Sequence, residues 1–559
     1  MMDLLIANMA PVMFASLIVF LLLGFPVAFA LAANGMVFGL IGVEMGLFNW
    51  SLFQALPLRV FGIMANDTLL AIPFFTFMGL ILERSGMAED LLDTIGQLFG
   101  SMPGGLAIAV VFVGAMLAAT TGVVSASVIS MGLISLPIML RYGYSRRLAT
   151  GVIAASGTLS QIIPPSLVLI VLADQLGRSV GDMYRGAMVP GLVLTCSYLL
   201  YVLILAVLRP KDVPAIPAEH RTYSQANGRS GTRSLCVLLL ISLVAGYVLD
   251  EFWVDPNGPV DEKVVICILL VGGVAFVLAL INKWLKLGLL SVLAERVVFV
   301  MIPPLGLIFL VLGTIFLGIA TPTEGGAMGA VGAILMAVSR RRLSIDLLKQ
   351  AMDTTAKLSC FVMFILIGST IFSLTFRGVD GDLWVEHLLL DLPGGEYGFL
   401  ILVSVLVFVL AFFLDFFELA FIIVPLLGPV ADKMGIDLIW FGVLLAVNMQ
   451  TSFMHPPFGF SLFYLRSVAP KDEYVDKVTQ KKIPGVATGD IYWGSVPFIC
   501  IQIVMIAVVL LFPGMVTHYK GTGVTVDPST VKIEMQAEYG ADLNPFGDSG
   551  DGGGMPVFK

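Results

Sequence analysis

The chain has 559 residues, of which 58% are hydrophobic and 13% are charged, and its mean hydropathy is +0.97. This composition excludes a soluble globular protein and indicates a polytopic all-α membrane protein, because a β-barrel would show short alternating segments instead. The net charge of −8 identifies no partner, since the charges divide between the two sides of a membrane.

Apolar runs of about 17 to 25 residues recur along the chain, and a helix of this length can cross a bilayer. The first run lacks a basic segment before it and a clean cleavage site after it, so we expect a helix rather than a signal peptide. No P-loop and no H-E-x-x-H motif is present, so no cofactor, direct use of ATP or nucleic-acid partner is expected. Five cysteines without ligand-like spacing are expected to be packing residues: Cys196, Cys236, Cys267, Cys360 and Cys500.

The distribution of charged loops predicts the orientation of the chain. Lysine and arginine concentrate in four loops that the positive-inside rule places in the cytoplasm: 141–147, 209–233, 283–286 and 339–342. Acidic or neutral loops alternate with them, including 250–262 and 377–396, and are expected outside. The N-terminus carries Asp3 and no basic residue, so it is also expected outside.

Each of two apolar stretches, 104–140 and 398–431, must leave the membrane on the side where it enters to satisfy this orientation. Each is predicted to form a re-entrant helical hairpin whose tip stops inside the protein. The small and polar run "TTGVVSAS" at 120–127 is the expected first tip, and "LDFFE" at 414–418 is the expected second tip.

The two halves of the chain repeat the same order of elements. Residues 137–165 align without a gap on 429–457 at an offset of 292, with identities that include Ser160 with Ser452 and both Pro-Pro pairs. In each half two helices around a Pro-containing turn precede a connector, a helix, a hairpin, a helix broken at Pro-Pro and a last helix. Because the hairpins open to opposite sides, the halves have inverted topology, which is typical of secondary transporters.

A helix that breaks inside a membrane frees backbone groups, each of which costs several kcal/mol if it stays unpaired in lipid. Half-helix N-termini suit an anionic substrate, and carbonyl and hydroxyl oxygens suit a desolvated Na⁺. The sequence therefore predicts a polar centre where the two breaks meet the two tips.

The candidate substrate and ion ligands lie at these four places. They are Thr120, Thr121, Gly122, Ser125 and Ser127 at the first tip, Ser156, Thr158, Ser160, Pro164, Pro165 and Ser166 at the first break, Asp415 and Glu418 at the second tip, and Asn448, Gln450, Thr451, Ser452, Pro456 and Pro457 at the second break. The Na⁺ candidates among them are Ser125, Ser160, Asp415, Thr451 and Ser452.

Several of these residues have a simpler structural interpretation. Any single hydroxyl could bond to a carbonyl one turn back, and Asp415 could be a helix N-cap rather than an ion or proton site. Glu418 could complete a capping arrangement or titrate together with Asp415. His455 is expected to be a packed, hydrogen-bonded ring rather than a proton relay, and Glu324 a charge at a helix N-terminus. No Arg or Lys occurs at the breaks, so a carboxylate would have to be held by amides, helix dipoles and co-bound cations.

The motifs "TTGVVSAS", "QIIPPS", "GIATPTEGGA", "FLDFFELAFIIVPLLGP" and "QTSFMHPPFGFSLF", in this order, resemble the large membrane subunit of tripartite ATP-independent periplasmic (TRAP) transporters over about 10–215 and 295–512. The resemblance implies an elevator-type, Na⁺-driven importer in the bacterial inner membrane, with its N-terminus in the periplasm and Na⁺ as the coupling ion. It also implies a small four-helix membrane subunit and a periplasmic solute-binding protein as partners, and a carboxylate-bearing substrate.

The resemblance implies a role for each predicted segment of the chain. The segments are first scaffold helices and arm at 1–66, first transport repeat at 67–210 with its broken helix at 145–176, linker and extra hairpin at 211–290, second scaffold helices and arm at 291–357, second transport repeat at 358–515 with its broken helix at 437–466, and a flexible tail at 516–559. The chain departs from the family pattern in "TTGVVSAS" for a glycine-rich tip, in "HPPFG" for "TPPVG", and in "FFELA" after Asp415.

Three other functions compete with the importer. A self-sufficient ion-coupled anion carrier or antiporter would need no soluble binding protein. An intramembrane enzyme could use Asp415 and Glu418 as a carboxylate pair, but their spacing suits one helical turn rather than two facing helices, so no enzyme is predicted. A channel is disfavoured, because inverted repeats of broken helices suit alternating access.

Overall fold

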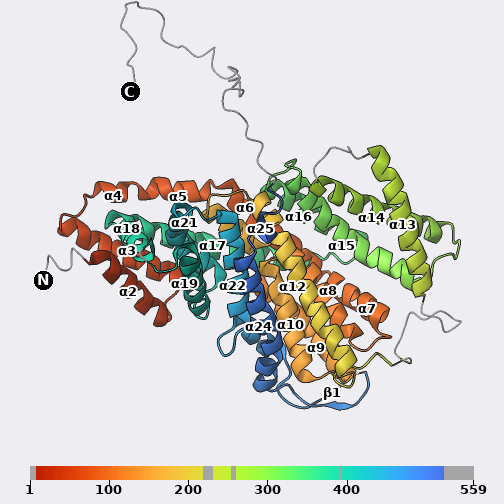
Figure 1. Ribbon diagram of the computed structural model, residues 1–559. Coiled ribbons are helices and arrows are strands. Elements are labelled where there is room, and N and C mark those ends of the chain that lie inside the picture. The colour runs from red at the N-terminus through yellow and green to blue at the C-terminus, as the bar shows by residue number, and fades with distance from the viewer. Residues whose placement is uncertain are drawn as a thin grey trace, which may run out of the picture. The chain divides into compact units, whose positions relative to one another are not determined.

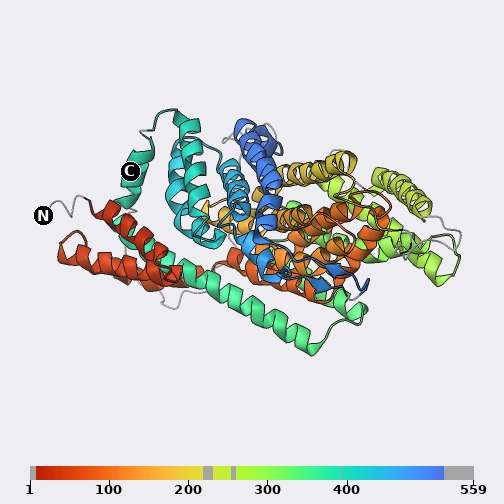
Figure 2. The same ribbon diagram turned by 90° about the horizontal axis from the view of Figure 1, so that it is seen from below.

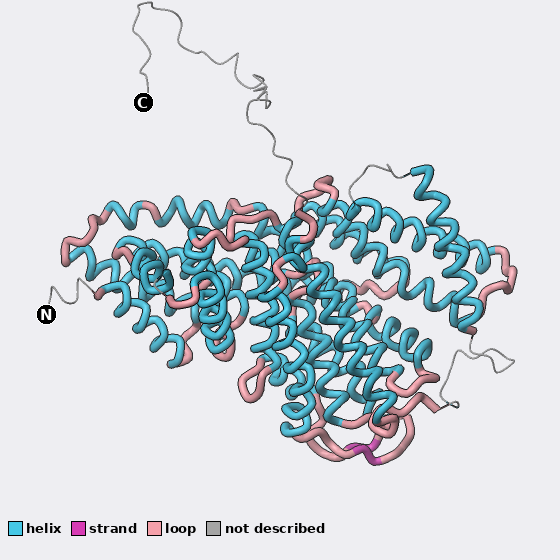
Figure 3. Tube along the Cα trace, viewed as in Figure 1, coloured by secondary structure: helices cyan, strands magenta, loops and turns pink. Residues whose placement is uncertain are grey.

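A computed structural model describes residues 8–217, 219, 231–253, 260–390, 392–476 and 478–520. These residues are helical apart from loops and one short strand pair (Figure 3). Within them, seven helices are long and apolar enough to cross a membrane, and the number rises to nine if each of two bent helix pairs is one span. The predicted polytopic all-α protein is therefore confirmed, and most of the predicted tail at 516–559 lies outside the described residues.

The first half of the chain forms the helices around the first break (Figure 1). They are α2 (Met9–Leu22), α3 (Val27–Glu44), α4 (Ser51–Gln54), α5 (Leu56–Met64), α6 (Asp67–Arg84), α7 (Met87–Phe99), α8 (Gly105–Thr121), α9 (Val124–Arg141), α10 (Arg146–Thr158), the 3₁₀ turn η1 (Leu159–Gln161), α11 (Leu167–Gln175) and α12 (Val180–Leu208).

The second half repeats this order after two additional helices, α13 (Thr232–Trp253) and α14 (Val260–Trp284). It contains α15 (Val292–Phe316), α16 (Pro322–Ser339), α17 (Ile345–Gly378), α18 (Gly381–Leu390), α19 (Gly395–Leu410), α20 (Phe416–Ile422), α21 (Val424–Lys433), α22 (Leu438–Met454), α23 (Phe460–Val468), β1 (Tyr474–Val475), β2 (Lys482–Ile483), α24 (Thr488–Leu511) and α25 (Gly514–Thr517). Figure 2 shows α17, with 34 residues, as one long helix that combines a connector and a span.

Helices of the two halves pack on each other in matching pairs: when a helix of the first half packs on one of the second half, their counterparts also pack together. The helix α6 packs on α16 while α17 packs on α3, and α10 packs on α24 while α22 packs on α12. Likewise α9 contacts α23, and α11 contacts α20. Each half therefore covers the other instead of forming a separate unit.

Glycine lets the helices with the most extensive contacts approach closely. A Cβ atom added at Gly368 of α17 would lie 2.4 Å from the carbonyl oxygen of Ala28 on α3, and one added at Gly35 would lie 2.8 Å from the carbonyl oxygen of Ile371. In a membrane, where lipid is as apolar as a leucine side chain, such close van der Waals contact is what holds helices together.

Three of the four half-helices at the breaks, α10, α11 and α22, are deeply buried. All residues of α22 are buried, and so are Leu148–Thr158 of α10 and Leu167–Ala173 of α11. By contrast, apolar side chains on α2, α3, α12 and α13 are exposed, for example Phe29 at 60% and Val207 at 81%. The irregular backbone of the first break is therefore surrounded by protein rather than lipid. At the second break Pro457 and Phe458 are exposed.

The prediction that the cysteines pack inside the protein is wrong. Cys196, Cys236, Cys360 and Cys500 are exposed, and Cys267 is half-buried. Their positions in apolar runs do not distinguish a core-facing side from a lipid-facing side, because a membrane helix is apolar on both.

A loop between α23 and α24 is held to α9 by one buried ion pair. The Arg141 guanidinium donates to both carboxylate oxygens of Asp476 at 3.0 to 3.1 Å, and the Thr479 amide and hydroxyl donate to Oδ2 at 2.8 and 2.7 Å. Burial alone would raise the pKa of Asp476, but these hydrogen bonds and the Arg141 charge lower it to about 2.

Asp476→Asn is expected to loosen this loop at neutral pH, because it removes the charge that holds Arg141. The pKa of Asp476 is depressed in the folded protein, so its stabilising contribution is present above the unfolded value of about 4 and is lost as pH falls toward 2. Hydrogen exchange in the loop should therefore be faster in the variant than in the parent at both pH 7 and pH 5. Asp472→Asn, at an exposed position of the same loop, should leave the exchange unchanged.

Candidate functional site

The first break joins α10 to α11 through η1 and the Pro164–Pro165 pair, whose peptide bond is cis. Its freed backbone groups find partners within the break. The Ile162 amide donates to the Leu159 carbonyl oxygen at 3.1 Å, and the Ser166 hydroxyl donates to the Gln161 carbonyl oxygen at 2.8 Å.

The second break joins α22 to α23 through Pro456–Pro457, which is also cis. The Gly459 amide donates to the His455 carbonyl oxygen at 2.8 Å, and the Ser461 hydroxyl donates to the Phe453 carbonyl oxygen at 2.6 Å. The ring of His455 is hydrogen-bonded through Nδ1 to the Pro456 carbonyl oxygen at 2.7 Å, which confirms the packed ring expected for this residue.

The two breaks meet at a pair of residues that are equivalent in the alignment of the two halves. Gln450 Nε2 donates to Thr158 Oγ1 at 3.4 Å, and their positions differ by 292, the offset of the alignment. Elements related by an approximate two-fold axis touch their own counterparts only next to that axis. This contact joins the buried helices α10 and α22, next to the position that such an axis would take.

The two hairpin tips reach the same place. Gly122, between α8 and α9, has φ +61°, and a Cβ added there would lie 2.8 Å from Leu167 Cγ at the start of α11. The second hairpin turns at 411–415, and its helix α20 packs on α11 while α9 of the first hairpin packs on α23. The first tip therefore contacts α11, and helices of both hairpins pack on half-helices of the breaks.

The first tip is shorter than the predicted run at 120–127. The helix α8 continues to Thr121 and α9 begins at Val124, because a glycine with positive φ reverses the chain within two residues. Ser125 and Ser127 consequently lie in the first turn of α9. The side chains of Thr120 and Thr121 lie outside the described residues.

Asp415 is the N-cap of α20, one of the two interpretations left open by the sequence. Its Oδ1 accepts from the Glu418 amide at 2.9 Å, and Glu418 Oε2 accepts from the Asp415 amide at 2.9 Å, which together form a capping box. The capping box uses Oδ1 of Asp415 and Oε2 of Glu418, and the Phe417 amide also donates to the Asp415 carboxylate. Glu324 also belongs to a capping box, with Thr321, as expected for a charge at a helix N-terminus.

The hydroxyls at the breaks all donate to backbone carbonyls. Three of them, Ser156, Thr158 and Ser160, donate to the carbonyl three residues back at 2.9 to 3.1 Å, and Thr451 donates to Val447 at 2.9 Å. Donation uses only the proton, so the lone pairs of Ser156, Ser160 and Thr451 remain able to face a cation, whereas Thr158 Oγ1 also accepts from Gln450.

Two candidates of the second break bond to the neighbouring hairpin instead. The Asn448 amide donates to the Ser404 carbonyl oxygen at 2.6 Å, and the Ser452 hydroxyl donates to the Phe408 carbonyl oxygen at 2.9 Å. They attach α22 to α19, so a hairpin movement would have to break these bonds or carry α22 along.

Sequence reasoning missed Gln161, which is fully buried in η1. Neither its amide nitrogen nor its amide oxygen has a hydrogen-bond partner among the described residues. Buried polar groups are normally paired, and those that are not require an explanation such as an unseen ligand, ion or water. An amide directly before Pro-Pro in an apolar run was the signal that could have identified it.

An aromatic wall lies beside the second break. The His455 ring lies 5.3 Å from Phe408 and 5.6 Å from Phe412 between ring centroids, and Phe458 lies 6.0 Å from Phe412 and 5.8 Å from Phe413. Phe413 and Phe458 are 51% and 45% exposed. The site therefore combines buried oxygens and amides with an accessible apolar surface.

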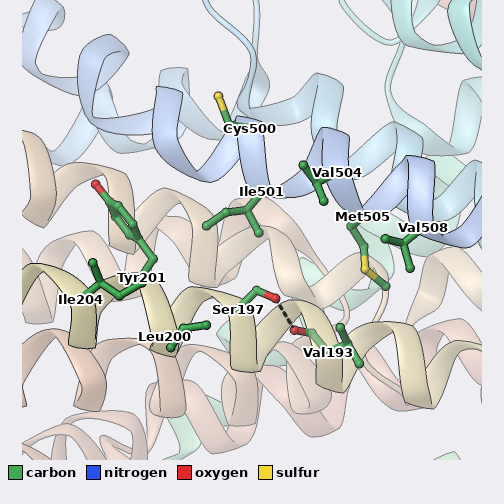
Figure 4. Close-up of a pocket in the computed structure, with 10 residues that line it drawn as sticks. All are labelled: Val193, Ser197, Leu200, Tyr201, Ile204, Cys500, Ile501, Val504, Met505 and Val508. Carbon is green, nitrogen blue, oxygen red and sulfur yellow. Dashed lines mark hydrogen bonds between the residues drawn. The ribbon is translucent and has the colours of Figure 1, made fainter.

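A separate apolar groove of about 400 Å³ lies between α12 and α24 (Figure 4). Aliphatic side chains with Tyr201, Cys500 and Met505 line it, and the Ser197 hydroxyl donates to the Val193 carbonyl oxygen at 2.8 Å. No charged group lines it, so it suits hydrocarbon better than an anionic solute.

Comparison with known proteins decides the family. Residues 14–515 match the family model of the tripartite ATP-independent periplasmic transporter, DctM component. The chain belongs to this family of TRAP transporter large subunits.

Relatives of this large permease are transporter proteins rather than enzymes. It is 26% identical over 474 residues to the C4-dicarboxylate TRAP transporter large permease protein DctM of Pseudomonas aeruginosa, covering 84% of this chain and 90% of the relative. It is 23% identical to the ectoine TRAP transporter large permease protein TeaC of Halomonas elongata, covering 90% and 97%. The crystal structure of the Alcanivorax borkumensis YdaH transporter aligns with a TM-score of 0.46 at 14% identity, covering 83% of this chain and 88% of that one.

Proposed function

We propose that this large permease imports small organic anions, with carboxylate-bearing solutes as the class, by Na⁺-coupled transport that depends on a soluble binding protein. The contact between Thr158 and Gln450 carries the proposal, because it brings two helix breaks and their polar groups together in a core that excludes lipid. Such centres of broken helices hold substrate and coupling ions in secondary transporters.

The two halves are inverted repeats that work as an elevator. The scaffold consists of α2 to α5, α15, α16 and the connector part of α17, and the moving part carries both hairpins and both broken helices. Support comes from the matching contacts between the two halves and from the continuous helices α6 and α17, which contact both parts. The basic loops face the cytoplasm, and the N-terminus lies on the periplasmic side of the inner membrane.

Different groups of the site hold the substrate carboxylate and the Na⁺ ion. The amides at the start of α11 and the side chain of Gln161 hold the carboxylate, because no Arg or Lys lines the breaks. The Asp415 carboxylate and hydroxyls such as Ser160 and Thr451 hold Na⁺, which balances the charge of the solute. The remaining candidates at the tips and breaks contribute backbone geometry or hydrogen bonds around these ligands.

A small four-helix membrane subunit and a periplasmic binding protein are the proposed partners. A related protein of Oleidesulfovibrio alaskensis is described as an isethionate TRAP transporter permease protein DctMQ. The chain covers 62% of that relative but 90% of the Pseudomonas aeruginosa protein, so the DctMQ protein extends well beyond the part that matches this chain.

Uptake into proteoliposomes tests the proposal. With an inward Na⁺ gradient and the binding protein present, the reconstituted permease and its small subunit are expected to accumulate a labelled carboxylate, with succinate as the first probe. Removing the gradient should abolish accumulation. Accumulation that persists without the binding protein would instead favour a self-sufficient carrier.

A further inference from the structure

A cavity of about 350 Å³ lies at the end of α6 that is remote from the basic loop 339–342. It opens between α5, the start of α6, the end of α11, α17 and α21. In the proposed orientation this end faces the periplasm. The cavity therefore lies between the scaffold and the outer end of the moving part, away from the breaks and tips.

A polar stripe on α17 lines one side of this cavity. Ser369, Thr370, Ser373 and Arg377 follow at intervals that place them on one face of the helix, and all four line the cavity. The same helix is otherwise apolar enough to cross a membrane. Polar groups in a spanning helix normally face a water-filled space rather than lipid, so this stripe indicates a solvated route.

The charges in the cavity favour an anion. Arg59 of α5 and Arg377 of α17 are exposed, and neither has an ion-pair partner among the described residues. Asp174 is the acid that lines the cavity, and its two oxygens accept hydrogen bonds from Asn66 at 2.8 Å and Gln175 at 2.9 Å. The two guanidinium groups therefore remain available to a carboxylate, with which they can form paired hydrogen bonds.

The Ser369 end of the stripe contacts the second hairpin. The Ser369 hydroxyl donates to the carbonyl oxygen of Phe421 on α20, the helix that Asp415 caps. The cavity thus leads from charged groups at the outer side to a helix of the second hairpin.

We propose that this cavity is an outer vestibule that binds the carboxylate of an organic anion between Arg59 and Arg377 before the anion enters the central site. The carboxylate as the physiological ligand rests on the proposed function, whereas the anion selectivity rests on the cavity itself.

Charged thiol reagents test the vestibule without any transport measurement. In a variant whose five native cysteines are alanine, Ser373→Cys is labelled from the periplasmic side by an anionic sulfonatoethyl or a cationic trimethylammonium-ethyl methanethiosulfonate. The ratio of the anionic to the cationic rate should fall on the order of tenfold when Arg59→Gln and Arg377→Gln are combined, because two nearby positive charges are lost. Succinate at constant ionic strength should slow the labelling.

Matched variants separate charge from folding. Arg59→Lys with Arg377→Lys should restore the ratio, and Arg178→Gln should leave it unchanged, since Arg178 is an exposed arginine paired with Asp432. Failure of either reagent to reach Ser373→Cys, or a ratio unaffected by the glutamine variants, would overturn the vestibule. Labelling that succinate does not slow would overturn its assignment to a carboxylate. A selective vestibule in a protein that imports no carboxylate would refute the importer and leave the anion site intact.

Discussion

Asp415→Asn is expected to lower Na⁺-dependent uptake by roughly tenfold or more while the amount of folded protein in the membrane stays the same. Asparagine caps a helix about as well as aspartate, so the start of α20 should remain intact. What disappears is the negative charge of the carboxylate. Hydrogen bonds and contacts that involve a charge are worth about 1.5 to 3 kcal/mol, which corresponds to the expected loss.

The second capping box of the protein provides the control. Glu324→Gln changes a carboxylate in the same motif at the exposed start of α16, remote from the breaks, and uptake should change little. Ser160→Ala should behave like Asp415→Asn if its oxygen faces the same cation, and initial rates measured against Na⁺ concentration report both. Unchanged Na⁺ dependence in both variants would remove Asp415 and Ser160 from the ion site.

The helix interruptions could be predicted because they depend on local chemistry. Proline has no amide hydrogen and disfavours a helical conformation of the residue before it, and the helices do end at the pairs 164–165 and 456–457, which polar residues precede. The pair at 303–304, in a purely apolar run, lies inside the continuous helix α15. The hairpins followed from length and loop charge, and α8 with α9 and α19 with α20 and α21 occupy the predicted stretches. These signals need no knowledge of what surrounds the segment.

The partners of the side chains could not be predicted, because they come from segments far away in the sequence. Asn448 and Ser452 had the composition of ion ligands, yet their donors bond to carbonyls of α19. Thr158 and Gln450 are equivalent by alignment but not identical, so no identity in the sequence marked the pair that meets at the axis. The hydrophobic period of a membrane helix also fails to show which side faces lipid, which is why the cysteine prediction failed.

Gly494→Ala is expected to destabilise the protein by about 3 kcal/mol or more, near the upper end of the usual cost of overpacking. A Cβ at Gly494 of α24 would lie 2.1 Å from the carbonyl oxygen of Arg147, and one at Gly151 of α10 would lie 2.0 Å from the carbonyl oxygen of Gly494. Both obstacles are backbone atoms of regular helices, so neither can move without separating α10 from α24. The melting temperature of the purified protein in detergent measures the effect.

The other half of the chain supplies a control at the equivalent crossing of α12 with α22. There Gly186 faces Ile439, the residue that aligns with Arg147 at the offset of 292. The atom nearest to an added Cβ is Cγ2 of the Ile439 side chain, at 2.9 Å. That contact is with a side-chain methyl group at 2.9 Å rather than with a backbone oxygen at 2.1 Å, so a small shift relieves it and Gly186→Ala should cost much less than Gly494→Ala. Equal decreases of the melting temperature in the two variants would show that the protein adjusts at both helix crossings. The carbonyl contact at Gly494 would then not be what holds the first broken helix against the last helix of the opposite half.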